Sequence, residues 1–337
     1  MIKNKRSKKN VKRRRLFKLL AIFIILIIID FGIFKIKNLI FSKVNKDVTT
    51  TTTKTKTYGA DINNASNDNS STSKTKEVIK SKVNPTTNPL VKPSDSDEFS
   101  KLKIQLEEMC ESNGVWSIYI KDLKSGESLS INNKKMVAAS LIKLFIMANT
   151  YQAIDSGNMK KTDEISGLLT KMITISHNES SNKLVELLGN GNQKTGMKVV
   201  NKFALSMDFL NTEQQRDMKD SRPVPVPGEN YTSVEDCAKL LESIYNNKCI
   251  SPDLDKEMMN LMLAQKRNTK LPALIPKGIK IAHKTGELGQ TENDVGIVFG
   301  PKTDYIICVM SNELKNTEEA RIRISQISKI TYEFLGN

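Results

Sequence analysis

The chain has 337 residues, enough for about two domains of 100–200 residues each. It contains 52 Lys and Arg against 37 Asp and Glu, a formal net charge of +15. Ten of the basic residues and no acidic one lie in residues 1–18, and removing them leaves 42 basic against 37 acidic residues. Since the excess is concentrated in a tail, the composition excludes a uniformly basic nucleic-acid-binding protein. A basic tail alone can neutralise nucleic-acid phosphates, but the segment that follows points to a membrane.

The apolar stretch from Leu16 to Phe34 follows the basic tail at once. Its length of about 19 residues, at about 1.5 Å rise per residue, is enough to cross a hydrocarbon core of about 30 Å. Asp30 is costly in a span, but it lies near the far end, where a carboxylate can reach the interface. No small-residue cleavage site or lipid-accepting Cys follows, which disfavours a cleaved signal peptide. We predict a transmembrane helix over residues 16–36.

The position of the basic residues predicts the topology of this anchor. Because they precede the apolar stretch or lie at its start, the positive-inside rule places residues 1–15 in the cytoplasm. Residues 37–97 are rich in Thr, Ser, Asn and Lys, which is typical of a disordered tether that cannot form a core. Residues 98–337 are then an extracellular domain at the cell membrane, held by a single-pass anchor.

Residues 98–337 alternate between helical and strand patterns. A helix with its apolar residues at helical spacing is expected from about residue 98, then two strands joined by a turn at residues 124–126. Helices are predicted next, then a group of strands, then a last helix. This order favours an α+β fold, a sheet with a helical insertion. The predicted strands are 115–121, 127–131, one starting near 279, 295–299 and 305–311, and the later helices are 140–156, 174–189, 232–245 and 318–334.

Ser140 is the first of three candidate catalytic positions. It opens an apolar helix, where backbone N–H groups and the helix dipole favour a developing negative charge. Lys143 lies one turn later on the same face and can take the proton of the hydroxyl. The small and apolar residues before Ser140 argue against the alternative, a helix cap followed by a surface lysine.

Two more short motifs follow in the chain. Ser176 and Asn178 begin a helix after an apolar stretch, and alone they are typical of a helix cap. Lys284, Thr285 and Gly286 lie on a predicted strand, where a glycine lets a ligand backbone approach the sheet edge.

In this order the three motifs resemble the Ser-x-x-Lys, Ser-Asp-Asn and Lys-Thr-Gly set of class A β-lactamases and penicillin-binding proteins, with His177 in place of the aspartate. Residues 98–337 are similar to the penicillin-recognising serine enzymes, and most similar to the class A β-lactamase-like group. The resemblance implies a five-stranded antiparallel sheet flanked by helices and a mostly helical lobe. It also implies that Ser140 forms an acyl-enzyme with the β-lactam carbonyl.

The resemblance implies a role for each motif residue. Ser140 is the nucleophile, Lys143 its activator, and Ser176 passes a proton to the leaving nitrogen. Asn178 holds the amide side chain of the substrate, and Lys284 and Thr285, beside Gly286, bind its carboxylate. The backbone N–H groups of Ser140 and Glu287 form the oxyanion hole.

The sequence departs from the family pattern at several places. His177 is expected to face the structure and not the substrate, and the short segment between Ser140 and Ser176 suggests a trimmed helical lobe. In the loop that carries the deacylating glutamate of class A enzymes, the alignment on Thr212 and Arg216 puts Met218 at the glutamate position. A methionine cannot activate water, although hydrolysis of the acyl-enzyme needs a base. The candidates for a substitute base are Glu213, Asp217 and Asp220.

The sequence therefore predicts a serine β-lactamase-like hydrolase acting on β-lactams, with antibiotic resistance as the consequence. The alternatives are a low-turnover penicillin-binding protein or D-alanyl-D-alanine peptidase in cell-wall metabolism, and a non-catalytic sensor of β-lactam or wall peptide. With two histidines, a zinc hydrolase and a Ser-His-Asp triad both lack parts. We expect no cofactor, no metal and no nucleic-acid partner. Buried free thiols are favoured for Cys237 and Cys308. An extracellular domain permits a disulfide, but the sequence cannot assign pairs among these two, Cys110 and Cys249.

Overall fold

The computed structural model describes residues 95–218 and 228–336. The predicted cytoplasmic tail, transmembrane helix and nearly all of the predicted linker lie outside these ranges, as does Asp220. Within the two ranges, none of the helices combines the length and apolar character that a membrane crossing needs. The elements, in chain order, are α2 (Asp95–Glu108), β1 (Val115–Asp122), β2 (Ser128–Ile131), β3 (Met136–Val137), the 3-10 turn η1 (Ala139–Leu141), α3 (Ile142–Asp155), α4 (Asp163–Thr174), α5 (Asn178–Leu188), α6 (Gln193–Ser206), β4 (Tyr231–Thr232), α7 (Val234–Tyr245), α8 (Pro252–Leu263), β5 (Lys280–Leu288), β6 (Thr291–Phe299), β7 (Asp304–Asn312), α9 (Thr317–Thr331) and the π-helical turn η2 (Tyr332–Gly336).

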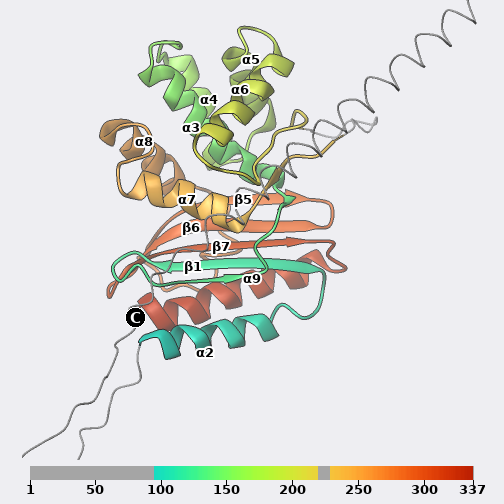
Figure 1. The fold of residues 1–337 in the computed structure, drawn as a ribbon, viewed down its shortest axis with the longest axis vertical. Coiled ribbons are helices and arrows are strands. Elements are labelled where there is room, and N and C mark those ends of the chain that lie inside the picture. Colours follow the sequence, from blue (N-terminus) through green and yellow to red (C-terminus); the bar gives the residue numbers. More distant parts are fainter. Residues whose placement is uncertain (1–94, 219–227, 337) are drawn as a thin grey trace, which may run out of the picture. The chain divides into compact units, whose positions relative to one another are not determined.

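The central element of the fold is a five-stranded sheet of order β2-β1-β7-β6-β5, drawn across the middle of Figure 1. Every neighbouring pair in it is antiparallel. The alternation of the strands divides their side chains between two cores. In β7, Ile306, Cys308 and Met310 belong to one core, and Ile307 and Val309 belong to the other. The predicted α+β fold with a five-stranded antiparallel sheet and flanking helices is confirmed.

The two terminal helices of the described domain, α2 and α9, cover one face of the sheet (Figure 1). Leu102 and Leu106 of α2 are buried with Ile324 and Ile327 of α9, against the strand residues of this face. Edge-to-face packing of Phe99 on Phe334, with ring centroids 5.4 Å apart, joins the two ends of the domain. The first and last helices thus close one layer although they are far apart in the sequence.

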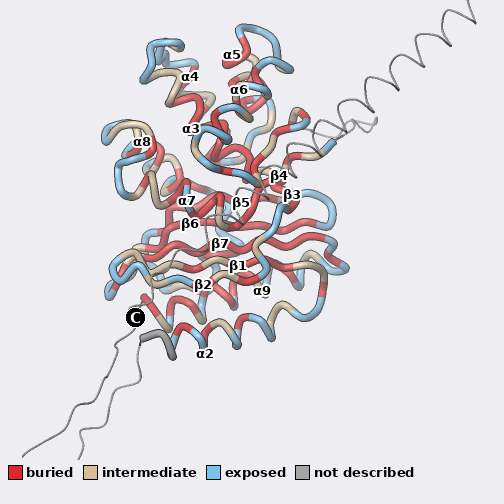
Figure 2. The backbone as a smooth tube through the Cα atoms, in the orientation of Figure 1, coloured by how far each residue is buried: buried red, intermediate tan, exposed pale blue. Residues whose placement is uncertain are grey.

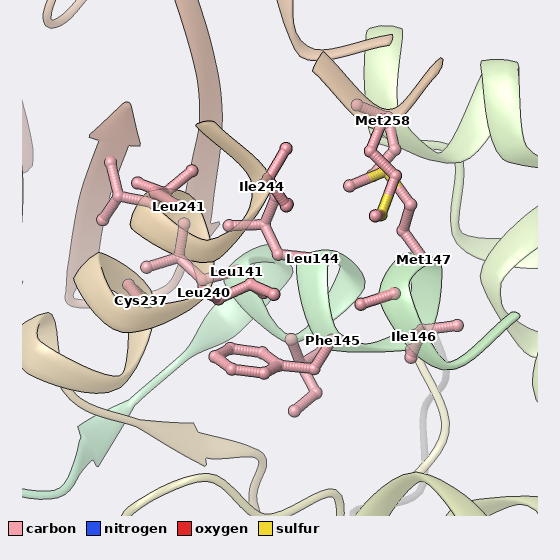
Figure 3. Close-up of a cluster of buried hydrophobic side chains, with 14 of the residues drawn as sticks. Leu141, Leu144, Phe145, Ile146, Met147, Cys237, Leu240, Leu241, Ile244 and Met258 are labelled. Atoms are coloured by element: carbon pink, nitrogen blue, oxygen red, sulfur yellow. The ribbon is translucent and has the colours of Figure 1, made fainter. Parts of the chain in front are cut away.

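The other face of the sheet is covered by α7, and the remaining helices are grouped beyond it (Figure 1). Helix α3 is the centre of this group, because its residues 142–151 are all buried. Figure 3 shows Leu141 and Leu144, at the start of α3, gathered with Leu240 and Ile244 of α7 in one apolar cluster. The colouring of Figure 2 likewise marks α3 and the central strands as buried, whereas the outer helices expose one side. The apolar sequence after Ser140 therefore forms a helix that is buried all round.

The predicted boundaries differ from the structure mainly in the helical part. The helix expected over 174–189 begins later than expected, since α4 ends at Thr174 and α5 runs from Asn178 to Leu188. Ser176 between them has a left-handed φ of 61°, which no continuous α-helix accommodates. Helices α4, α6 and α8 were not predicted. The four cysteines are free thiols, as favoured from the sequence for Cys237 and Cys308, and all but Cys110 are buried.

Candidate active site

The backbone that leads into Ser140 is fixed by two asparagines of the sheet. The side-chain amide of Asn293 on β6 donates to Val137 O at 3.0 Å and to Ala138 O at 3.2 Å. Asn312 on β7 accepts from Val137 N at 2.7 Å. Ala139, next in the chain, has a left-handed φ of 46°. These bonds hold a strained turn that presents Ser140, half-buried, at the start of α3.

Gly286 on β5 faces this turn. A Cβ on Gly286 would stand 2.9 Å from Ala138 O and 3.3 Å from Ser140 N. From the sequence, the missing side chain of Gly286 was expected to let a ligand backbone approach. This interpretation is incomplete, because the glycine also lets the backbone of the turn that carries Ser140 approach. The close approach brings the amide of Ser140 beside the strand that carries the amide of Glu287. This is the arrangement that a two-donor oxyanion hole requires.

Lys143 is fully buried one turn into α3. Its ammonium donates to Ser176 O at 2.6 Å, to Ser176 Oγ at 3.2 Å and to Asn178 Oδ1 at 2.7 Å. The first and second motifs are thus brought together, and Asn178, expected to hold a substrate amide, has its carbonyl oxygen directed to Lys143.

Ser176 is the point at which all three motifs meet. Its hydroxyl oxygen accepts from Lys143 and, at 2.9 Å, from Lys284 on β5. A hydroxyl has two acceptor lone pairs and one proton to donate. With both lone pairs turned to the lysines, the proton of Ser176 is directed away from them. A group in that position can deliver a proton to a leaving atom of a bound ligand.

Lys284 is as deeply buried as Lys143. Its ammonium donates to Thr285 O at 2.7 Å as well as to Ser176. Burial, and next the positive charge of Lys143, hold the pKa of Lys284 well below its usual range, although Asp294 acts in the opposite direction. Two buried lysines that share one hydroxyl disfavour the state in which both carry a proton. The site thus contains an amine suited to act as a base.

His283, next to Lys284 on β5, and Asp294 on the neighbouring strand β6 are both buried. His283 Nδ1 and Asp294 Oδ1 are 2.9 Å apart, and the other oxygen of Asp294 accepts from Leu271 N at 3.1 Å. Asp294 on β6 is the register partner of Thr285. Sequence reasoning assigned no role to Asp294, which lies in the polar first half of β6.

Met218 is buried beside α5. Asn182 binds its backbone twice, accepting from Met218 N at 2.8 Å and donating to Met218 O at 3.0 Å. The sulfur of Met218 is 3.6 Å from the side-chain amide of Asn230. Since Asn182 is four residues after Asn178, both lie on one face of α5. Met218 is therefore attached one helical turn from a residue that contacts Lys143.

The substitute bases proposed from the sequence have different surroundings. Glu213 forms an ion pair with Lys135 at 2.6 Å. Hydrogen bonds from Lys135 and Gln215 lower its pKa, which makes it a weak proton acceptor. The backbone oxygen of Asp217 accepts from Arg216, and the guanidinium of Arg216 also pairs with Glu229 at 2.6 Å. This ion pair ties the segment before Met218 to the segment after the undescribed residues.

His177 differs from its expected orientation. It was expected to face the structure, but it is exposed. Its Nδ1 accepts from Ser180 N at 3.2 Å and so caps the start of α5. The residue stabilises the helix that carries Asn178.

Comparison with known proteins agrees with this geometry. Residues 101–167 and 164–335 match the model of a family described as the beta-lactamase enzyme family. The chain belongs to that family. No curated protein matches it. Membership makes the acyl-serine interpretation of the three motifs the leading one, while the role of each residue stays a prediction.

Solved structures share the fold. The structure of PBP-A is 26% identical with a TM-score of 0.63, over 69% of this chain and 95% of that one. The TLA-1 extended-spectrum β-lactamase is 19% identical with a TM-score of 0.64, over 71% and 99%. A β-lactamase from Sphaerobacter thermophilus DSM 20745 is 21% identical with a TM-score of 0.61, over 70% and 97%. For the two β-lactamases, at 19% and 21% identity, the similarity shows a shared fold alone.

Proposed function

We propose that the domain is a serine hydrolase that β-lactams acylate at Ser140. The observation that carries the proposal is the convergence of two buried lysines on the hydroxyl of Ser176, beside the turn that presents Ser140. Family membership supports a β-lactam as the substrate class. A mutant of PBP-A, 26% identical to this chain, is described as an acyl-enzyme complex with penicillin G.

The proposed reaction begins with attack of Ser140 Oγ on the lactam carbonyl carbon. The hydroxyl proton passes to Lys143 in its neutral form, and the N–H groups of Ser140 and Glu287 stabilise the oxyanion. The carbon–nitrogen bond of the ring then breaks, and Ser176 protonates the nitrogen. Lys143, hydrogen-bonded to Ser176 Oγ, returns its proton to that oxygen. Attack of water on the ester later releases the acid and restores Ser140.

The second candidate function is a low-turnover penicillin-binding protein or D-alanyl-D-alanine peptidase. Met218 favours it, because a buried thioether beside α5 supplies no base for the attack of water. The first step of the two candidates is the same, and only the lifetime of the acyl-enzyme differs.

The decisive experiment exposes the full-length protein in detergent to a fluorescent penicillin and a chromogenic cephalosporin. Steady turnover that Ser140→Ala abolishes supports a β-lactamase, and one lasting label per chain supports the penicillin-binding alternative. Ser156→Ala, at an exposed helix end, is the control and should behave as wild type. If the wild type shows neither label nor turnover, the acyl-serine proposal fails and a non-catalytic sensor becomes the better interpretation.

A further inference from the structure

The side chain of Glu287 lies next to the expected carboxylate subsite. Side chains alternate along a strand, so those of Thr285 and Glu287 leave β5 on the same face. Thr285 is the residue expected to bind the substrate carboxylate together with Lys284. A second, built-in carboxylate thus stands beside the place where an anionic substrate group would bind.

Two cations hold this carboxylate. Lys270 Nζ is 3.1 Å from one of its oxygens and Arg267 Nη1 is 3.2 Å from the other. Burial raises the pKa of Glu287, but the charge and hydrogen bond of Lys270 and the charge of Arg267 outweigh it, so the pKa is lowered. Glu287 is therefore an anion at neutral pH.

The surroundings of Lys270 show that this contact is built into the fold. Lys270 is fully buried and also binds Glu292 at 2.8 Å, and its ammonium is 3.4 Å from Gly286 O. Arg321 of α9 contacts the other oxygen of Glu292 at 2.8 Å. Cations and carboxylates alternate in this cluster, from Arg267 through Glu287, Lys270 and Glu292 to Arg321.

Lys284 is poorly placed to serve an anionic substrate by itself. Its ammonium is fully buried and donates to Ser176 Oγ and Thr285 O. The cations that contact the end of β5 are Lys270 and Arg267, and Glu287 already neutralises them. A substrate carboxylate that binds these cations must share them with Glu287 or displace the Glu287 side chain.

We propose that Glu287 is a specificity-determining residue whose carboxylate occupies the cationic subsite at the end of β5 and competes with the anionic group of the substrate. The inference rests on the proposed function, since it concerns ligands that acylate Ser140. It predicts that the wild-type site discriminates against an anionic group beside Thr285 and tolerates a neutral one.

The test compares a penicillin free acid with its methyl ester, which lacks the negative charge at this position and carries one additional methyl group. Second-order rate constants for acylation of Ser140 are measured by mass spectrometry on the full-length protein and on Glu287→Gln. The glutamine keeps the size and a hydrogen-bond acceptor for Lys270 but removes the charge. We expect the acid-to-ester ratio of rate constants to rise about five- to tenfold, a modest effect because Glu287 is partly exposed.

Two further variants extend the test. One should change the acid-to-ester ratio in the opposite direction, and the other is a control. Arg267→Gln removes a cation from the half-exposed end of the same cluster and should lower the acid-to-ester ratio. Glu318→Gln removes an exposed carboxylate that pairs with Arg321 at 3.2 Å, and the ratio should not change. The three variants separate the local charge at β5 from the net charge of the protein.

The outcomes are distinguishable. An unchanged ratio in Glu287→Gln, or equal changes for acid and ester, would overturn the proposal, because a merely structural role affects both ligands alike. If Glu287→Gln does not fold, an Arg267→Gln ratio that stays at the wild-type value would overturn it. If neither ligand labels Ser140 of the wild type, the proposed function fails and the inference fails with it.

Discussion

At the residue scale, the burial of Lys143 and Lys284 in the site lowers the stability of the folded protein. Each is fully buried, and both donate to the hydroxyl of Ser176. Removing a lysine ammonium from water is costly, and a like charge nearby adds to the cost. In the mechanism proposed above, the same arrangement supplies a base and a proton donor beside Ser140.

The burial of Lys284 should be visible in the pH dependence of stability. Its pKa is lowered in the folded protein by burial and by Lys143, whereas in the unfolded chain it is about 10.4. Between the two values the folded state binds fewer protons, so the free energy of unfolding rises with pH and levels off above about 10.4. Urea unfolding of wild type and Lys284→Met should show the wild type gaining stability relative to the variant as pH rises towards that value.

Lys302→Met is the control for this experiment, because it removes one positive charge from an exposed turn. If wild type and Lys284→Met differ by the same amount at every pH, the folded state does not bind fewer protons at Lys284. The proposal that one of the two lysines acts as a base would then lose its electrostatic support.

Met218 permits a second prediction at the residue scale. Because Asn182 fixes its backbone on both sides, a replacement side chain should start from the same place. Met218→Glu introduces a carboxyl whose pKa is raised by burial, as suits a general base. We expect hydrolysis of the acyl-enzyme to accelerate by about a hundredfold or more, measured as the loss of penicillin label over time.

Met218→Gln is the matched control, since it has similar size and no basic group. It should leave the label as long-lived as in the wild type. Equal rates in the glutamate and glutamine variants would show that position 218 does not face the acyl group. The alignment that places Met218 at the glutamate position would then be wrong.

At the scale of elements, the contact between β5 and η1 positions the site. The absence of a Cβ at Gly286 lets the strand approach the turn that carries Ser140. Gly286→Ala would push a methyl group against Ala138 O, a backbone atom that Asn293 already holds. We expect a loss of about 1–3 kcal/mol of stability and a larger loss of acylation rate, because the Ser140 amide is displaced.

Gly167→Ala is the natural comparison, because a Cβ there meets nothing within 4 Å on helix α4. Alanine at an open helical position should stabilise by about 0.5–1 kcal/mol and leave acylation unchanged. Thermal unfolding and penicillin labelling of both variants test the pair. If the two substitutions act alike, close packing of β5 on the Ser140 turn is not what requires glycine.

The strands were predictable for a local reason. The segments after Lys284 are continuous apolar runs, and the structure has β6 and β7 there with both faces buried. Helices α4 and α6 were missed although their buried residues have helical spacing, as Ile165, Leu169 and Ile173 do in α4. The helix predicted from residue 174 begins at Asn178 instead, because the left-handed backbone of Ser176 interrupts a helix there.

The site, like the fold, has parts that could be predicted from the sequence and parts that could not. Its three motifs are short and local, so the sequence alone located them, although it assigned Ser176 to a helix and the structure has it between α4 and α5. The residues that arrange them were not predictable, because their partners are distant. Asn293 reaches the turn before Ser140 across more than 150 residues of chain, and Lys270 meets Glu287 only through the loop that precedes β5. Contacts of this kind have no signature in spacing or composition.

At the scale of the whole molecule, the proposed chemistry requires access to β-lactams, and this depends on segments beyond the described domain. Residues 16–36 are apolar enough to span a bilayer, whereas the basic residues before them suit an anionic membrane surface. The two modes of attachment differ in their response to salt. A polybasic tail is released when salt screens its charges, but a spanning helix is held by the hydrophobic effect and is not.

We therefore expect the full-length protein, expressed in bacteria, to stay in the membrane fraction after washing with about 1 M salt, at which the screening length is about 3 Å. Deletion of residues 1–36 should release it, and deletion of residues 46–90, which removes most of the predicted linker and leaves the apolar stretch, should not. Penicillin labelling of each fraction reports whether the domain remains folded. Release of the full-length protein by salt would mean that the basic tail, and not a transmembrane helix, attaches the enzyme. A protease added outside intact cells should digest the labelled domain if that domain is extracellular, as the positive-inside rule predicts.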